Sequence, residues 1–160
     1  MGKLAGVEIV GLDGELGPLT RQLFDYWLEK RGDRPMPARR DLDPIEMPKI
    51  LPHIMLMDVE PSTGRMKFRL VGTRVVQMFG ADNTGRYLDE VDFGEQRPLI
   101  LESYHTALER AAGHHRRMGF INKDGLKYEM ERLIMPLSSD GGRTVDKLIS
   151  LLDIKENIAG

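Results

Sequence analysis

The last third of the chain is the part of the sequence that most constrains its fold. Three apolar segments, at 114–122, 126–137 and 144–154, are separated by short polar turns that each contain Asp-Gly. An Asp-Gly pair between apolar runs is a strong short-range signal for a β-hairpin. The three segments therefore predict three consecutive antiparallel strands.

A second pair of strands precedes them. Residues 54–60 and 65–71 flank a Pro-Ser-Thr-Gly turn, and in the second segment Met66, Phe68 and Leu70 alternate with basic residues. This two-residue period is typical of a strand with one buried face. The pattern predicts a hairpin whose second strand has these three side chains on its buried face.

Helical periodicity occurs at residues 18–31, 73–80 and 98–112, where apolar side chains recur at spacings of three and four. The first of these segments begins at a proline and ends before a glycine, as helices often do. Strands that pair on both sides of a helical insert predict an α+β domain with a five-stranded antiparallel sheet. The first helix is expected either on the outer face of this sheet or against the same helix of a second subunit.

The chain divides into four parts. Residues 1–17 hold five glycines and are expected to form a flexible tail or a weakly docked strand fragment. Residues 18–53 combine the first helix with a proline-rich connection, residues 54–154 form the domain core, and residues 155–160 form a second tail. A chain of 160 residues has the usual length of one domain.

Composition excludes several classes of function. The net charge is −2, so no field of one sign draws the protein to nucleic acid or to an anionic membrane. No signal peptide or membrane-spanning run is present in the sequence. The chain has no cysteine, which excludes disulfides, thiolate metal sites and cysteinyl-flavin photochemistry. We expect a cytoplasmic protein without a nucleic-acid or membrane partner.

Several motifs together resemble those of a PAS domain. They are a hairpin that ends in Phe-Arg-Leu-Val-Gly-Thr, a loop at Asn83-Thr84-Gly85-Arg86, a helix through His105, and the closing strands. The tryptophan-bearing first helix, an Arg/Asp-Pro connection and the Leu51-Pro52 step are similar to those of a bacterial family of stand-alone PAS proteins. The resemblance covers residues 18–153.

The PAS resemblance implies a sheet and helices that can enclose a small molecule, and an outer face that can dock a helix or another subunit. PAS domains as a class bind haem, flavins, carboxylic acids or nothing, so the fold alone does not identify a ligand. Apolar walls with a few polar groups are typical of small-molecule sites. The predicted ligand-binding residues are Phe68, Leu70, Val76, Phe79, Tyr87, Leu88, Leu101, Tyr104, His105, Leu108 and Arg132.

Two of these residues carry distinctive chemistry. His105 stands where haem-binding PAS domains place an axial imidazole, although a hydrogen-bonded core or rim histidine is the favoured interpretation. The planar guanidinium of Arg132 suits a ligand carboxylate, with a structural salt bridge as the favoured alternative.

No catalytic or metal-binding residue is predicted. His114 and His115 are adjacent on a strand, so they point to opposite faces and are poorly placed to share a metal. Glu129 and Glu131 share one face, which we interpret as solvated, and therefore lack the contrasting environments that general acid–base catalysis needs. Motifs for metal-assisted hydrolysis and nucleotide binding are absent from the sequence.

The leading functional hypothesis is a non-enzymatic sensory or regulatory module that binds a small molecule, a protein partner, or both. A wide apolar stripe around Leu23, Phe24 and Trp27 predicts an interface, so we expect a homodimer or a complex with a signalling partner. A ligand-free interaction or structural module is the first alternative, and a small α+β enzyme is the second.

Overall fold

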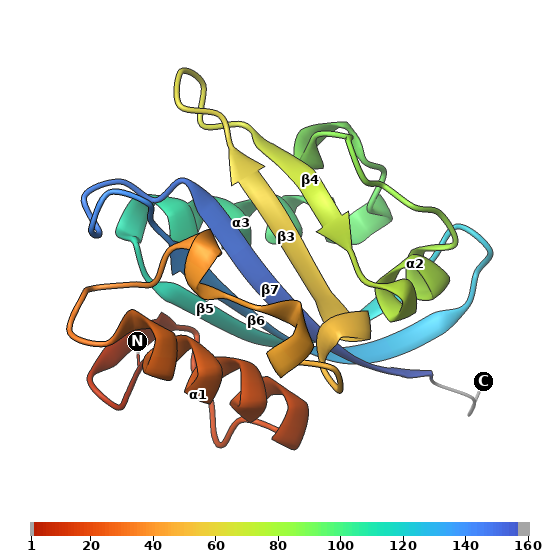
Figure 1. The fold of residues 1–160 in the computed structure, drawn as a ribbon. Helices are drawn as coiled ribbons and strands as arrows, with labels where there is room; N and C mark the ends of the chain where they lie inside the picture. The colour runs from red at the N-terminus through yellow and green to blue at the C-terminus, as the bar shows by residue number, and fades with distance from the viewer. Residues whose placement is uncertain (1, 157–160) are drawn as a thin grey trace.

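The structure, a computed structural model, describes residues 2–156, in which seven strands form one sheet with helices on both faces (Figure 1). The order across the sheet is β1-β2-β5-β6-β7-β3-β4, and every neighbouring pair is antiparallel except β2 and β5. The predicted meander and hairpin are therefore confirmed as β5–β6–β7 and β3–β4. The strands are β1 (Gly2–Leu4), β2 (Val7–Val10), β3 (Ile54–Val59), β4 (Met66–Val71), β5 (Gly113–Ile121), β6 (Lys127–Leu137) and β7 (Lys147–Glu156).

The helices define two faces of the sheet. Helix α1 (Pro18–Arg31) contacts β6 and β7 on the face that we call outer. Helices α2 (Thr73–Phe79) and α3 (Arg97–Arg110) lie on the opposite, inner face (Figure 1). Five short 3-10 helices occupy the connections, at Arg39–Asp41, Pro44–Glu46, Leu51–His53, Leu88–Glu90 and Gly94–Gln96.

The N-terminal segment is a hairpin, which corrects the predicted flexible tail. Ala5 and Gly6 both have positive φ, as a tight hairpin turn requires, and Ile9 of β2 pairs with Gly113 of β5 and is fully buried. The sheet consequently has two more strands than predicted and is mixed. Residues 155 and 156 of the predicted second tail belong to β7, whereas residues 1 and 157–160 lie outside the described residues.

Helix α1 buries the apolar stripe that was predicted to form an interface. Leu23, Phe24 and Trp27 have exposed fractions of 1%, 0% and 2%, and the Trp27 indole N–H donates a hydrogen bond of 2.9 Å to the Pro136 carbonyl of β6. These three side chains are thus covered by the outer face of the chain's own sheet. They are not exposed to a second subunit, so the interface prediction fails for them.

A carboxylate from β6 holds the start of α1. Glu131 accepts hydrogen bonds from the Gly17 backbone N–H at 3.1 Å and from the Thr20 hydroxyl at 2.8 Å, and His115 Nε2 lies 2.7 Å from its second oxygen. A Cβ at Gly17 would lie 2.6 Å from Oε1, so a larger residue there would displace the Glu131 carboxylate. Glu131 is therefore buried beneath α1, which corrects the prediction that it lies on a solvated face; Glu129 is exposed as expected.

Burial alone would raise the pKa of Glu131, but its hydrogen bonds with His115, Thr20 and Gly17 bring the pKa below the ordinary value. The ionised carboxylate also lies at the positive end of the α1 dipole, where a negative charge is favourable. Glu131 therefore stabilises the contact between the helix and the sheet in its charged form.

A β-bulge in the β3–β4 hairpin changes which face Leu70 occupies. Leu56 pairs with Leu70 and Met57 pairs with Phe68, so Arg69 is an extra residue in β4. A bulge of this kind breaks the two-residue alternation. Phe68 consequently faces inward, whereas Leu70 lines an outer-face hollow with Leu56, which corrects its predicted position.

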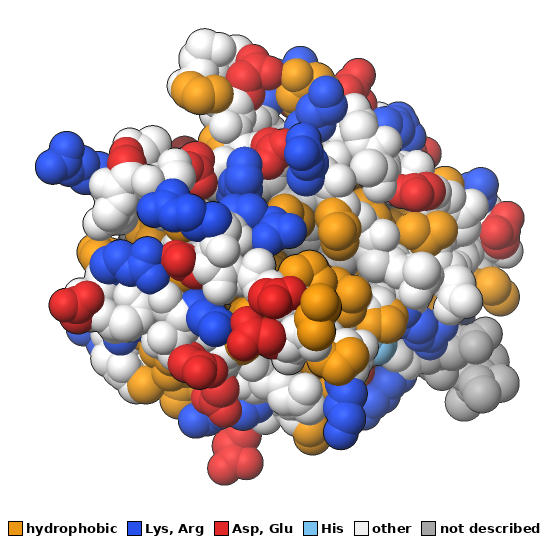
Figure 2. Space-filling view, viewed as in Figure 1, with side chains coloured by type: hydrophobic (Ala, Val, Ile, Leu, Met, Phe, Trp, Pro, Cys, Tyr) orange, Lys and Arg blue, Asp and Glu red, His pale blue; other side chains and the backbone are white. Residues whose placement is uncertain are grey.

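On the outer face, acidic and basic side chains are interspersed, and apolar side chains gather near β3 and the segment that precedes it (Figure 2). Within residues 2–156, no helix is long and apolar enough to cross a membrane.

The burial of Trp27 generates a stability prediction. We expect Trp27→Ala to lower the free energy of unfolding by about 3–5 kcal/mol, because it leaves a large cavity between α1 and β6. Denaturant unfolding measures this change. Arg21→Ala, on the exposed side of the same helix, is the matched control and should change stability by about 0.5 kcal/mol or less. Equal effects of the two substitutions would contradict the buried position of Trp27.

Candidate functional site

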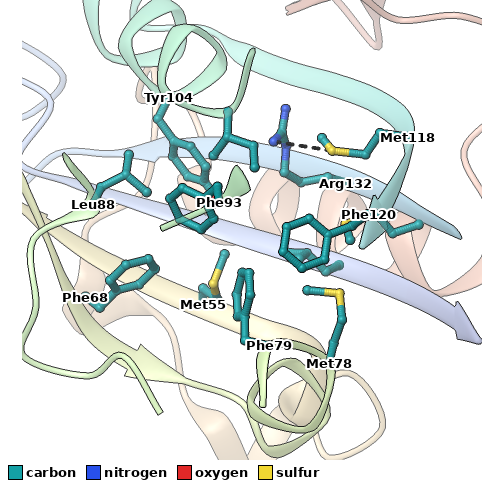
Figure 3. A pocket seen from close by; sticks show the side chains of 13 residues that line it. Met55, Phe68, Met78, Phe79, Leu88, Phe93, Tyr104, Met118, Phe120 and Arg132 are labelled. Carbon is teal, nitrogen blue, oxygen red and sulfur yellow. Dashed lines mark hydrogen bonds between the residues drawn. The ribbon is translucent and has the colours of Figure 1, made fainter. Parts of the chain in front are cut away.

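A small cavity lies between the inner face of the sheet and helices α2 and α3 (Figure 3). Its volume is about 20 Å³, enough for roughly one water molecule. Small-molecule sites usually measure about 300–1,000 Å³, so this cavity is far smaller than such a site. Its lining residues are Met55, Phe68, Met78, Phe79, Leu88, Phe93, Ile100, Tyr104, Met118, Phe120, Met130, Arg132 and Leu152.

Aromatic rings and methionines form most of the wall. The ring of Phe79 lies 5.7 Å from that of Phe93 and 5.3 Å from that of Phe120, with the second pair edge to face. Such offset or edge-on arrangements are favourable for aromatic pairs. Four lining residues are methionines, whose unbranched side chains adopt alternative rotamers readily. The wall can therefore rearrange at lower cost than one made of β-branched residues.

Within residues 2–156, Arg132 is the only charged side chain on this wall, and no acidic group pairs with its guanidinium. Its exposed fraction is 2%, and its Nε and Nη2 atoms have no hydrogen-bond partner among the described residues. Nη1 lies 4.0 Å from the Met118 sulfur, and the guanidinium carbon lies 5.5 Å from the Tyr104 ring centre. Figure 3 shows the guanidinium between these two side chains, at the edge of the apolar cluster. These weak contacts leave most of its hydrogen-bonding capacity unused.

A second arginine lies directly opposite. The sheet register pairs Arg116 of β5 with Arg132 of β6, so the two side chains emerge on the same face. Arg116 is half-buried, and no hydrogen bond or salt bridge connects its side chain to another described residue. Burial lowers the pKa of Arg132, and the positive charge of Arg116 acts in the same direction. Because arginine does not lose its proton in proteins, the site keeps an uncompensated positive charge.

Two more polar side chains lie near the arginines. The Tyr104 hydroxyl is 3.0 Å from the Ser150 hydroxyl, so these two groups satisfy each other, and burial raises the pKa of Tyr104. His114 occupies the same sheet face as Arg116, and its buried Nδ1 has no hydrogen-bond partner among the residues described. Burial and the charges of Arg132 and Arg116 lower the pKa of His114 to about 4.

The structure brings together five of the eleven predicted ligand-binding residues. Phe68, Phe79, Leu88, Tyr104 and Arg132 line the cavity. The structural salt bridge that was favoured for Arg132 is not formed within residues 2–156, since no acidic group contacts its guanidinium.

The other predicted residues lie outside the cavity. Leu70 faces the outer side, Val76 of α2 and Leu101 and Leu108 of α3 are half-buried away from the lining, and the Tyr87 hydroxyl donates to Glu60 on the surface. His105 is exposed to solvent. An imidazole directed to solvent does not fit the axial haem ligand that was considered for it.

The position of His105 follows from how α3 approaches the sheet. The buried side of the helix contains Ile100, Ser103, Tyr104 and Ala107. The helix packs on the sheet through this side, and Leu101 and Leu108 are only half-buried. His105 lies on the side of the helix that is exposed to solvent.

Eight lining residues were not predicted. Met118 and Phe120 of β5 and Met130 of β6 have the same parity as residues that face inward, so strand alternation indicates their orientation. The remaining ones depend on the register between distant strands and on irregular connections. They are Met55, Met78, Phe93, Ile100 and Leu152.

The described residues contain no group of three or more histidine or acidic side chains placed to bind a metal ion. His115 and Glu131 form a close pair, but this pair lies on the outer face beneath α1, on the other side of the sheet from the cavity. Its contacts with Gly17 and Thr20 indicate a structural role.

Comparisons with known proteins agree with this architecture. The family model described as PAS domain matches residues 17–152. No curated protein matches the sequence.

Solved structures with a similar fold include light-oxygen-voltage (LOV) domains. The dark structure of the blue-light photoreceptor Aureochrome1 LOV is 11% identical, with a TM-score of 0.54 over 72% of this chain and 85% of that chain. The LOV domain of the blue-light activated histidine kinase from Erythrobacter litoralis EL346 is 14% identical, with a TM-score of 0.51 over 65% and 95%. A structure from a flavin-analogue study of a light-oxygen-voltage domain is 18% identical, with a TM-score of 0.51 over 65% and 77%. At these identities the similarity concerns the fold alone.

The unpaired guanidinium generates a prediction about stability. We expect Arg132→Met to raise the free energy of unfolding by at least about 1 kcal/mol, because it replaces a buried charge without a partner by an apolar side chain of similar length. The measurement is denaturant unfolding of protein refolded after dialysis, which removes any bound molecule. Arg69→Met removes an arginine whose side chain is 70% exposed and serves as the control. A substantial loss of stability in Arg132→Met would show that Arg132 supports the fold.

His114 generates a prediction about pH. Its pKa is about 4 in the folded chain and about 6.5 when unfolded, so the unfolded state binds more protons between these values. We expect stability to fall as pH decreases from about 6.5 towards 4, with a slope from this group of at most about 1.4 kcal/mol per pH unit. NMR titration of the imidazole, together with unfolding of wild type and His114→Gln, measures both effects. A His114 imidazole that titrates near pH 6.5 would contradict the prediction.

Proposed function

Because the chain belongs to the PAS domain family, we propose that it is a sensory or regulatory module that binds a small molecule in the cavity between α3 and the sheet. The bound state is passed on through contacts with a protein partner or a second copy of the chain. PAS folds host many functions, so the proposal depends on the site and not on the fold.

The observation that carries the proposal is the buried guanidinium of Arg132 on the cavity wall. Two of its nitrogen atoms have no partner among the described residues, although its exposed fraction is 2%. A charged donor that is buried without a hydrogen-bond partner costs on the order of several kcal/mol. Native proteins therefore rarely contain one unless it serves a function. A bound molecule that accepts these hydrogen bonds supplies that compensation.

The small volume of the cavity limits how a ligand can bind. A volume of about 20 Å³ does not accommodate a metabolite, so binding requires the wall to move. Methionines on three different strands and on α2 surround the cavity and can change rotamer. A ligand that binds only the open form shifts the population towards it, which is the conformational change that a sensor needs.

Strand β6 connects the cavity with α1. Arg132 faces the cavity, and the preceding residue, Glu131, holds the N-terminus of α1 on the other face. A ligand that displaces β6 therefore also affects the hydrogen bonds that hold α1. We propose this route for the signal, in place of a direct interface formed by Trp27.

A ligand-free interaction module is the second candidate, and the small volume of the cavity favours it. The enzyme alternative has less support, because the close His115–Glu131 pair lies away from the cavity. Homodimerisation, a cytoplasmic location and membership of the stand-alone bacterial PAS family remain predictions from the sequence.

Neither cofactor associated with the fold suits the residues present. A flavin would require the wall to open much further than a small ligand does, and this chain has no cysteine to form a flavin adduct. Haem lacks a histidine ligand in this cavity, since His105 is exposed and His114, on the inner face of β5, is not among the lining residues.

The proposal is tested by native mass spectrometry of protein purified from cells without unfolding. We expect a non-covalent adduct of small mass that disappears after denaturation and is absent from Arg132→Met. Arg69→Met, the surface control, should keep the adduct. Protein that carries no adduct, and that is not stabilised by any member of a broad metabolite library in thermal unfolding, would contradict the proposal and favour the ligand-free module.

A further inference from the structure

We propose that the molecule bound in the cavity is a small amphipathic carboxylate, with its carboxylate between Arg132 and Arg116 and its apolar body among the phenylalanine rings. This inference rests on the proposed function and specifies the class of ligand. It follows from the local charge, from the geometry of the free donors and from the composition of the wall.

Among the described residues, the strand positions around Arg132 on the inner face carry positive charge and no acid. Met130, Arg132 and Ile134 of β6, and the residues opposite them on β5 and β7, include two arginines and no Asp or Glu. The acids nearest along β6, Glu129 and Glu131, have the opposite parity and lie on the outer face. Like charges directly opposite each other in an antiparallel pair are destabilising. An anion between the two arginines removes this repulsion.

The free donors of Arg132 have the geometry of a carboxylate site. Nε and Nη2 carry N–H groups along one edge of the planar guanidinium, and both lack partners among the described residues, whereas Nη1 on the other side faces the Met118 sulfur. Two parallel N–H groups on one edge match the two oxygens of a carboxylate in a bidentate contact. This free edge of the guanidinium therefore matches an acceptor with two coplanar oxygens better than it matches a single carbonyl or hydroxyl oxygen.

Arg116 supplies a second positive charge from the neighbouring strand. It is half-buried, so it can remain partly hydrated while Arg132 is fully enclosed. One carboxylate balances the enclosed charge, and transfer of a dianionic phosphate into the same apolar surroundings costs more desolvation. The arrangement therefore favours a monoanion that enters with its carboxylate near Arg116 and Arg132.

The remainder of the ligand has to be apolar and small. The other described wall side chains are apolar except Tyr104, and its hydroxyl already pairs with Ser150. Phe79, Phe93 and Phe120 form a connected aromatic surface suited to a ring or a short hydrocarbon chain. Among the lining residues that the structure describes, no second unsatisfied polar group requires another polar substituent on the ligand.

The test compares acids with their neutral amides. Phenylacetate and octanoate are the acidic probes, phenylacetamide and octanamide are the isosteric neutral probes, and inorganic phosphate reports anion binding without an apolar body. Binding is measured by isothermal titration calorimetry on refolded protein. Methionine methyl NMR shows whether Met118 and the other wall methionines sense the probe.

We expect at least one acid to bind and to shift the wall methionine signals, and its amide to bind at least about tenfold more weakly, because a charged hydrogen-bonded contact is lost. Arg132→Met should weaken binding of the acid by about tenfold or more, and Arg132→Lys should restore only part of it, because lysine lacks the planar fork. Arg116→Met should have a smaller effect. Arg69→Met should bind as wild type.

Equal binding of acids and amides, binding of phosphate as tight as that of the acids, or failure of all acids to bind would overturn the carboxylate assignment. If the amides bind as tightly as the acids, or if the protein from cells carries a neutral adduct, the small-molecule module stands and only the ligand class is wrong. If neither any probe nor any cellular adduct binds, the proposed function fails as well. Unfolding curves establish that each variant is folded before binding is measured.

Discussion

The two-residue alternation of β6 is the constraint on which the site depends. Glu131 and Arg132 are adjacent in sequence and opposite in charge, yet consecutive residues of a strand point to opposite faces of the sheet. They cannot pair with each other. Glu131 binds the start of α1 on the outer face, and Arg132 is left on the inner face without a counter-ion among the described residues. One feature of backbone geometry thus produces both a fixed helix and an uncompensated charge in the core.

Both consequences arise on one strand, so adjacent residues of β6 contact the cavity and the outer helix. β6 contacts both α1 and α3, and its neighbour β5 brings Arg116 to the same face as Arg132. The apolar wall around these charges is nearly closed, and its methionines provide the freedom to open. Two positively charged arginines thus lie beside an apolar wall that can rearrange. This arrangement suits a change of conformation that depends on an anionic ligand.

Much of this architecture could be predicted from the sequence, because the meander, the hairpin and the helices follow from local periodicity. The site could be predicted only in part. Alternation placed Phe68 correctly, but it failed for Leu70, because the bulge at Arg69 reverses the face of the strand. The apolar period of α3 predicted that His105 faces inward, but the helix packs through the side that carries Ser103 and Ala107, and His105 is exposed.

The largest difference concerns Trp27. An apolar stripe that covers the chain's own sheet has the same sequence pattern as a stripe that covers another subunit, so periodicity alone does not distinguish the two. The contact partner of Arg132 posed the same difficulty. A buried arginine usually forms a salt bridge. Whether an acid stands opposite Arg132 depends on the register of β5, β6 and β7, which the sequence pattern does not give. The central claim is tested most directly by an experimental structure of the protein purified from cells without unfolding. The account predicts a carboxylate whose two oxygens lie about 2.7–3.0 Å from Nε and Nη2 of Arg132. A well-ordered Arg132 whose two nitrogens meet only protein side chains or water would contradict it.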